Sequence, residues 1–162
     1  MTTSSIERPV RTPPVGKPAP DFELQSTAGT TVRLSEFVGR SPVLLAFFPL
    51  AFTSTCTAEL CAFSDDFDQF AGKGVVVLPI SVDAVPSLKE FKAKYAMKTD
   101  LLSDFRRDAS RGYGVLREDK FFSERAYFLI DREGVLRWAF VEDALGSKRA
   151  NAELLERIAA LG

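Results

Sequence analysis

The segment FFPLAFTSTCTAELC, which runs from Phe47 to Cys61, joins the end of an apolar run to the beginning of a helical pattern. Residues 43–48 are all apolar, as in a strand covered on both faces, and Pro49 ends this strand because it has no N–H to donate. Hydroxyl side chains follow, and helical spacing then continues from Cys56 to Phe70. We therefore expect Cys56 in the first turn of a helix, where free backbone N–H groups and the helix dipole favour a thiolate.

The composition is that of an ordinary globular protein. The chain has 162 residues, which suit one domain with a substantial core, and 46% of them are hydrophobic. A formal net charge of −1 gives no electrostatic reason to expect nucleic acid or a membrane as a partner. No apolar run approaches the ~18 residues of a membrane span. The first residues lack the apolar core of a signal peptide, so we expect a cytoplasmic protein.

Two cysteines and no histidine restrict the chemistry that the chain can perform. The cysteines are too few for a disulfide scaffold and do not have the spacing of a zinc site. The absence of histidine excludes Cys–His and Ser–His catalysis and any histidine-bound metal, and we expect no metal or other cofactor. Another group must therefore activate Cys56.

The remaining pattern predicts an α/β protein. Residues 1–18 are polar and proline-rich and are expected to form a flexible tail ahead of one domain at residues 19–162. The predicted strands are residues 22–25 and 31–34, which form a hairpin, then 43–48, 75–82 and a short one at 101–102, and then 126–130 and 135–141, which form a second hairpin. The predicted helices are residues 56–70, a helix that begins near residue 86, a short one near 108–111 and a terminal one at 152–161.

This order of elements is that of the thioredoxin-like fold. It predicts a mixed central β-sheet with flanking helices and an N-terminal β-hairpin extension. Ligands bind open α/β sheets at the carboxyl ends of central strands, which is where the turn before Cys56 is expected to lie.

The motif Pro49-x-x-x-Thr53-x-x-Cys56 resembles the active-site signature of the peroxiredoxins, which are thiol peroxidases with a thioredoxin-like fold. Residues 47–53 resemble the AhpE branch in particular. Three further blocks resemble the family in its order: residues 16–22, 101–104 and 125–131. The resemblance implies a peroxidase that reduces hydrogen peroxide and organic hydroperoxides. It also implies recycling by a thiol reductant such as thioredoxin, glutaredoxin or mycoredoxin.

The resemblance assigns a role to each matching residue. Cys56 resembles the peroxidatic cysteine, whose thiolate attacks the O–O bond and becomes a sulfenic acid. Thr53 resembles the hydroxyl that hydrogen-bonds the thiolate and the peroxide, and Pro49 the residue that packs over the sulfur. Arg125 resembles the arginine whose guanidinium meets the sulfur, and Glu59 the acid that braces it.

Each of these residues also has an ordinary structural interpretation when it is taken alone. Cys56 could be an inert core cysteine, Thr53 a turn hydroxyl and Arg125 a surface cation, and the helix dipole favours Glu59 whatever its function. Two other functions are open at this point. One is a thioredoxin-like disulfide oxidoreductase, although its Cys-x-x-Cys is missing, and the other is a non-enzymatic redox sensor.

Cys61 follows Cys56 after four intervening residues. Positions five apart on an intact helix have Cα atoms roughly 8–9 Å apart, beyond the ~7 Å limit for a disulfide. A bond between the two cysteines would therefore require the start of the helix to unwind. The same separation occurs in the Q-type (bacterioferritin comigratory) peroxiredoxins, and this resemblance implies that Cys61 is a resolving cysteine. The alternative is a cysteine that only fills the core.

Apolar residues beside the active-site loop bear on assembly. Leu50, Ala51, Phe52 and Phe105 are expected to be partly exposed there. Because related proteins often pair through surfaces near this loop, the resemblance predicts a homodimer.

Overall fold

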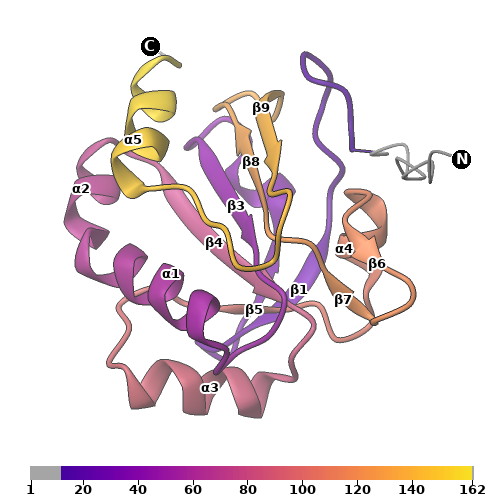
Figure 1. The fold of residues 1–162 in the computed structure, drawn as a ribbon. Coiled ribbons are helices and arrows are strands. Elements are labelled where there is room, and N and C mark those ends of the chain that lie inside the picture. The colour runs from indigo at the N-terminus through magenta and orange to yellow at the C-terminus, as the bar shows by residue number, and fades with distance from the viewer. Residues whose placement is uncertain (1–11, 162) are drawn as a thin grey trace, which may run out of the picture.

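Within residues 12–161, which the computed structural model describes, seven strands form one mixed sheet in the order β2-β1-β5-β4-β3-β8-β9 (Figure 1). These strands are β1 (Glu23–Ser26), β2 (Thr31–Arg33), β3 (Val43–Phe47), β4 (Val76–Ser81), β5 (Leu102–Ser103), β8 (Ala126–Ile130) and β9 (Leu136–Val141). The helices are η1 (Leu34–Phe37), α1 (Ser54–Asp65), α2 (Phe67–Gly72), α3 (Val85–Lys94), α4 (Asp108–Gly112) and α5 (Asn151–Ala159). Over these residues, none of the helices is long and apolar enough to cross a membrane. The predicted thioredoxin-like α/β fold is confirmed.

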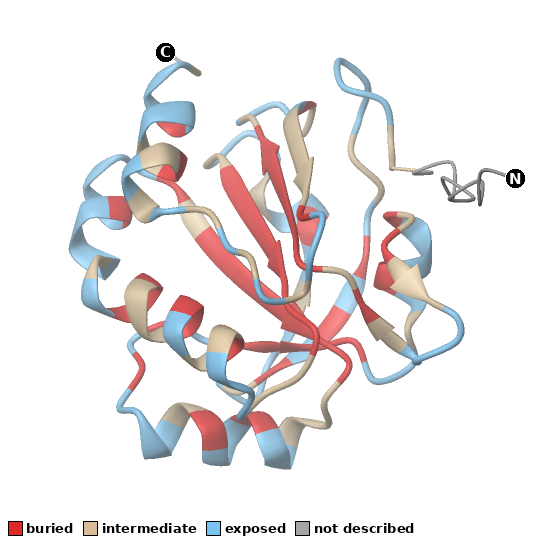
Figure 2. Cartoon of the chain, viewed as in Figure 1, coloured by how far each residue is buried: buried red, intermediate tan, exposed pale blue. Residues whose placement is uncertain are grey.

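The central strand β3 pairs in parallel with β4 and antiparallel with β8. All of its residues are buried, and Figure 2 shows it in the middle of the buried layer. On one face Leu44 and Ala46 belong to a core cluster with Phe63 of α1 and Ile158 of α5. On the other face Val43, Leu45 and Phe47 belong to a cluster with residues of β1 and α4. Cover on both faces explains why the apolar residues of this strand do not alternate with polar ones.

Both predicted hairpins are present. β1 and β2 pair antiparallel and join the main sheet through β5, and β8 and β9 pair antiparallel around the turn at residues 131–134. Gly134 in this turn has φ +85°, and a Cβ built there would lie 2.9 Å from a methyl carbon of Val38. The turn therefore needs glycine both for its backbone conformation and for its contact with the chain before β3.

The helix predicted over residues 56–70 is divided in the structure. α1 and α2 are separated by Asp66, which has φ −98° and ψ 16°. Asn151 at the start of α5 holds this break, because its side-chain amide donates to the carbonyl of Ala62 and to Asp66 Oδ2, both at 2.8 Å. Phe67, the first residue after the break, is 37% exposed. The prediction of one continuous helix was therefore wrong. The spacing of apolar residues along one segment carries no information about a contact with a distant helix such as α5.

The predicted tail is attached to the sheet over part of its length. Its residues 1–11 lie outside the described residues. Gly16 donates its N–H to the carbonyl of Leu136 at 2.8 Å, and Leu136 donates to the carbonyl of Lys17 at 3.0 Å. Pro18 forms a bridge with Val135. Residues 16–18, which the prediction placed in the tail, therefore pair with the chain at the start of β9, because backbone pairing does not depend on apolar side chains.

A small hairpin was missed by the sequence analysis. β6 (Leu116–Arg117) and β7 (Phe122–Ser123) pair antiparallel outside the main sheet, immediately before Arg125. Each strand has only two residues, which is too short for any period to be visible in the sequence.

Candidate active site

Cys56 lies in the first turn of α1, as predicted. Thr53 precedes the helix in an extended conformation (φ −79°, ψ 153°), and its carbonyl accepts the N–H of Thr57. The N–H groups of the three residues between them, Ser54 to Cys56, belong to the first turn and have no partner within the helix. The N-terminal end of a helix favours negative charge, and Cys56 lies in this first turn. Cys56 itself is only 1% exposed.

Strand register brings Arg125 to the sulfur. Ala126 at the start of β8 pairs with Phe47 at the end of β3, so the residue before it lies beside the turn that follows β3. Arg125 is 1% exposed, and its Nη2 donates to Cys56 Sγ at 3.0 Å and to the carbonyl of Leu145 at 3.2 Å. A buried guanidinium that donates to a sulfur stabilises the thiolate over the thiol.

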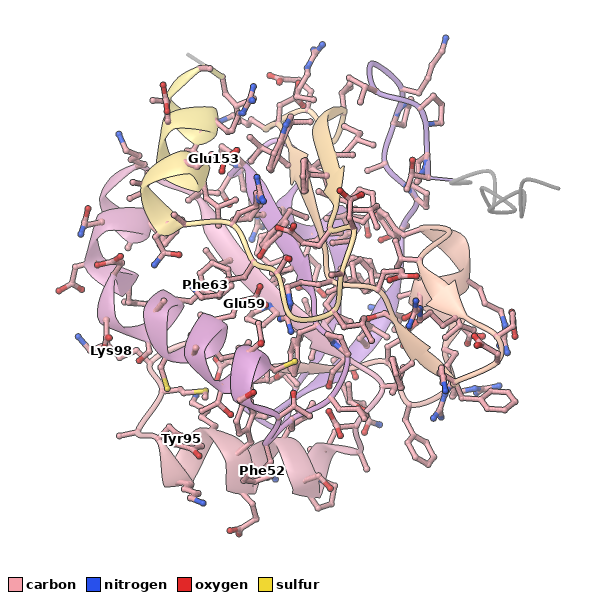
Figure 3. All side chains as sticks on the ribbon, viewed as in Figure 1. Phe52, Glu59, Phe63, Tyr95, Lys98 and Glu153 are labelled. Carbon is pink, nitrogen blue, oxygen red and sulfur yellow. The ribbon has the colours of Figure 1, made fainter. Side chains whose placement is uncertain are left out.

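Glu59 lies one turn further along α1 and faces the sheet, as Figure 3 shows. Its Oε1 is 3.1 Å from Nη1 of Arg125, and both side chains are almost fully buried. Burial raises the pKa of Glu59, while the charge of Arg125 and a hydrogen bond from Tyr127 act in the opposite direction. Burial by itself lowers the pKa of Arg125, but Glu59 and Cys56 outweigh this and keep it above its usual value. The guanidinium is therefore a permanent positive charge beside the sulfur.

Thr53 and Pro49 are placed by the loop between β3 and α1. Thr53 Oγ1 donates to the carbonyl of Leu50 at 2.8 Å, so its proton is directed into the loop. Pro49 is buried two residues after the end of β3. The roles predicted for these two residues, toward peroxide and sulfur, stay predictions.

An aspartate that the sequence analysis missed holds this loop. Asp83 Oδ2 accepts the N–H of Ala51 at 2.8 Å and the hydroxyl of Ser81 at 2.7 Å. Phe52, the next residue in the loop, has a positive φ of 66°. Asp83 follows the second buried strand. Ligands bind α/β sheets at the carboxyl ends of central strands, so a polar residue at this position was the signal that could have identified Asp83 from the sequence.

Tyr127 and the connection between β9 and α5 were also missed. Tyr127 Oη donates to Glu59 Oε2 at 2.6 Å and accepts the N–H of Arg149 at 3.0 Å. Figure 1 shows this connection crossing in front of the sheet, and its Leu145 carbonyl is the one that Arg125 contacts. Tyr127 was interpreted as part of an apolar strand. Its place two residues after Arg125, on the same face of β8, was the signal that could have found it.

Cys61 lies on the same helix as Cys56, and both thiols are free. It is partly buried against the core cluster that contains Cys56, Leu88 and Phe91. Burial raises the pKa of the Cys61 thiol, and the charge of Asp65 raises it further. With α1 intact the two sulfurs are not at disulfide distance.

The described residues contain no group of three or more histidine, cysteine, aspartate or glutamate side chains that could hold a metal ion. The charged side chains that the structure places at Cys56 are Arg125, which contacts the sulfur, and Glu59, which pairs with Arg125.

Comparisons with known proteins identify the family of this chain. The profile of the AhpC/TSA family matches residues 15–139. The chain is 40% identical over 128 residues to a protein named putative peroxiredoxin bcp from Coxiella burnetii, covering 75% of this chain and 84% of that one. It is 38% identical over 127 residues to alkyl hydroperoxide reductase E from Mycobacterium bovis, covering 77% and 83%.

Among solved structures, the reduced 2-Cys peroxiredoxin of Plasmodium vivax superimposes with a TM-score of 0.84 at 35% identity, covering 91% of this chain and 81% of that one. The chain spans about three fifths of the length of the chloroplastic 2-Cys peroxiredoxins of Spinacia oleracea and Arabidopsis thaliana that it also matches, 60% and 59% respectively. The matched region includes Cys56 together with Arg125, whose contact at 3.0 Å defines the site. This chain therefore belongs to the AhpC/TSA family and is a peroxiredoxin of the Q and AhpE type.

Proposed function

We propose that this protein is a thiol-dependent peroxidase that reduces hydrogen peroxide and organic hydroperoxides at Cys56. The observation that carries this proposal is the 3.0 Å contact between Arg125 Nη2 and Cys56 Sγ, in the first turn of a helix and away from solvent. The helix N–H groups and the guanidinium supply the positive potential that a chain without histidine must find elsewhere.

The reaction begins when the Cys56 thiolate attacks one oxygen of the peroxide. An S–O bond forms as the O–O bond breaks, so the sulfur is oxidised to a sulfenic acid and the peroxide is reduced. The departing oxygen carries the electron pair of the broken bond and takes a proton to leave as water or an alcohol. Donors directed at that oxygen lower the barrier, and the guanidinium of Arg125 is placed to be one of them.

Mass spectrometry of the reduced protein after one equivalent of hydrogen peroxide tests the proposal. A peroxidase gains one oxygen on Cys56 or loses two hydrogens in a Cys56–Cys61 disulfide, within the time of mixing. A disulfide oxidoreductase would leave peroxide untouched and react with a disulfide substrate instead. A redox sensor would be oxidised once without turnover on added thiol. An unmodified Cys56 would contradict the proposal.

Cys61 is proposed as the resolving cysteine. Its thiolate would attack the sulfenic sulfur of Cys56, forming the disulfide and releasing water. This requires the first turns of α1 to open, which breaks the contacts of Arg125 with Cys56 and Glu59. The disulfide would then be reduced by a thiol donor such as thioredoxin, glutaredoxin or mycoredoxin. A cytoplasmic location, where thiols stay reduced, is part of the same proposal.

The raised pKa of Cys61 predicts the pH dependence of this step. Because most of the thiol is protonated at neutral pH, disulfide formation should accelerate about tenfold per pH unit until the pKa is reached. Rapid quenching with an alkylating agent, followed by mass spectrometry, measures this rate. Cys61→Ser is the control: it should form the sulfenic acid at the parent rate, give no intramolecular disulfide and over-oxidise more readily. Normal turnover of Cys61→Ser with the physiological reductant would mean that Cys61 only packs in the core.

A homodimer is proposed from the apolar surface beside the active-site loop. Phe52 is 48% exposed and Phe105 is 59% exposed, while Leu50 and Ala51 are half-buried. Large exposed aromatic rings are typical of an interaction surface. Light scattering at high micromolar concentration should give twice the mass of the chain, and Phe105→Asp should reduce it toward the monomer. A monomeric mass for the parent protein at that concentration would refute the dimer.

A further inference from the structure

Tyr127 connects the site to the segment that closes over it. It is fully buried in β8, and Arg125 lies two positions earlier, just before the strand, so both side chains are on the side of the sheet where Glu59 lies. Its Oη lies 2.6 Å from Glu59 Oε2 and 3.0 Å from the backbone nitrogen of Arg149. The amide can only donate and an ionised carboxylate can only accept. The one phenolic proton is therefore directed at Glu59.

The hydrogen bond of Tyr127 divides the carboxylate of Glu59 between two partners. Oε2 receives the phenol, while Oε1 is left to face Nη1 of Arg125 at 3.1 Å. Arg125 then has Nη2 free for Cys56 Sγ at 3.0 Å. The guanidinium is thus shared between a carboxylate and a sulfur.

The ion pair itself is not in its preferred geometry. An arginine and a carboxylate usually form two parallel hydrogen bonds. Among the described residues, Nε and Nη1 of Arg125 and Oε1 of Glu59 are buried without an aligned hydrogen bond, although the charges are in contact. A guanidinium with unused donors would turn toward a free carboxylate oxygen if one were available.

We propose that Tyr127 is a positioning residue for this site: its hydroxyl occupies Oε2 of Glu59 and thereby keeps Nη2 of Arg125 on the sulfur of Cys56. Without the hydroxyl, Oε2 becomes a buried acceptor with no donor, which is costly. The guanidinium is the donor within reach, and a bidentate pair with Glu59 would draw Nη2 away from Cys56. The thiolate would lose a charge-assisted hydrogen bond.

The variant Tyr127→Phe tests this inference, with Tyr113→Phe as the matched control. Tyr113 is also buried, and its hydroxyl donates to the carbonyl of Pro20 at 2.7 Å. Tyr127→Phe loses two hydrogen bonds of a buried phenol and Tyr113→Phe loses one, so a general loss of stability is expected in both variants. Both are prepared in a Cys61→Ser background, so that Cys56 is the one cysteine whose ionisation changes the absorbance at 240 nm. Far-UV circular dichroism verifies the fold.

Two measurements report on Cys56. Thiolate formation in Tyr127→Phe should move to higher pH by about one unit, which corresponds to about a tenfold change in the ionisation equilibrium. Oxidation by hydrogen peroxide at pH 7 should be slower, because Nη2 of Arg125 no longer stabilises the reacting thiolate or the departing oxygen. Tyr113→Phe should match its parent in both measurements.

The route through Glu59 is tested by a double-mutant cycle. If Tyr127 acts through the carboxylate, adding Tyr127→Phe to Glu59→Gln should change the titration and the rate much less than it does in the parent. An undiminished effect in that background would overturn the route. A titration and rate in Tyr127→Phe equal to those of Tyr113→Phe would overturn the inference itself.

The measurement of the oxidation rate depends on the proposed peroxidase function, whereas the titration of Cys56 does not. If the parent protein fails to react with peroxide, the proposed peroxidase function is wrong. The titration of Cys56 then decides by itself whether Tyr127 is a positioning residue.

Discussion

Cys56→Ser should reduce peroxide consumption to the rate observed without protein. The hydroxyl of serine does not ionise near neutral pH, so no nucleophile remains to attack the O–O bond. The fold should persist, because the change replaces one buried atom and leaves the first turn of α1 and the contact between Arg125 and Glu59 in place. Peroxide consumption by the pure variant in the presence of a thiol donor is the measurement.

Cys61→Ser is the matched control for this experiment, since it changes the same atom on the same helix. It should keep the first oxidation step, whereas Cys56→Ser should lose it. If the pure Cys56→Ser protein still turns over peroxide, the reacting group lies elsewhere in the chain and the proposed function is wrong.

Arg125→Met should slow the oxidation of Cys56 by about 10²-fold, the usual cost of removing one donor from a developing charge. The sulfur loses its contact at 3.0 Å, so thiolate formation should also move to higher pH. Stopped-flow oxidation across a range of pH measures both effects. Arg117→Met is the control, because it removes an arginine that is paired with Glu124 on a partly exposed surface. Unchanged rates in Arg125→Met would mean that the guanidinium does not act on the sulfur in solution.

The same variant should show a changed dependence of stability on pH. Burial already raises the pKa of Glu59, and the loss of Arg125 removes the largest influence that lowers it. An acid whose pKa is higher in the folded state binds more protons when folded, so the free energy of unfolding falls as pH rises. The free energy of unfolding should keep falling until the pH has passed the raised pKa of Glu59. The total loss should be at most about 3–5 kcal/mol, the cost of an unpaired buried charge. Urea denaturation at several pH values tests this, and a flat profile would contradict it.

The turn around Cys56 was predictable because its signals are local. An apolar run that ends at Pro49, followed by hydroxyl residues and helical spacing, predicts a strand, a loop and a helix without any knowledge of the rest of the chain. The same is true of the two hairpins, whose turn residues and alternation are local patterns. The position of Cys56 in the first turn of α1 follows directly from these signals.

Arg125 was a different case. Nothing local distinguishes it from an ordinary surface cation, and only the resemblance to a known family pointed to it. The structure buries it beside Cys56 because β8 pairs with β3 in a particular register. That register depends on which strands become neighbours, and a pattern along one segment carries no information about it.

The amino-acid sequence alone was sufficient for the fold class, the central strand and the place of Cys56, since each depends on residues close together in the chain. The break of the helix at Asp66, the contact of Glu59 with Tyr127 and the closing segment with Leu145 depend on residues 20 to 85 positions apart, as their hydrogen bonds show. Such contacts form where packing brings distant elements together, and the donors and acceptors are buried there and must pair. For this reason the nucleophile could be found from the sequence, whereas the network that positions its arginine required the folded chain.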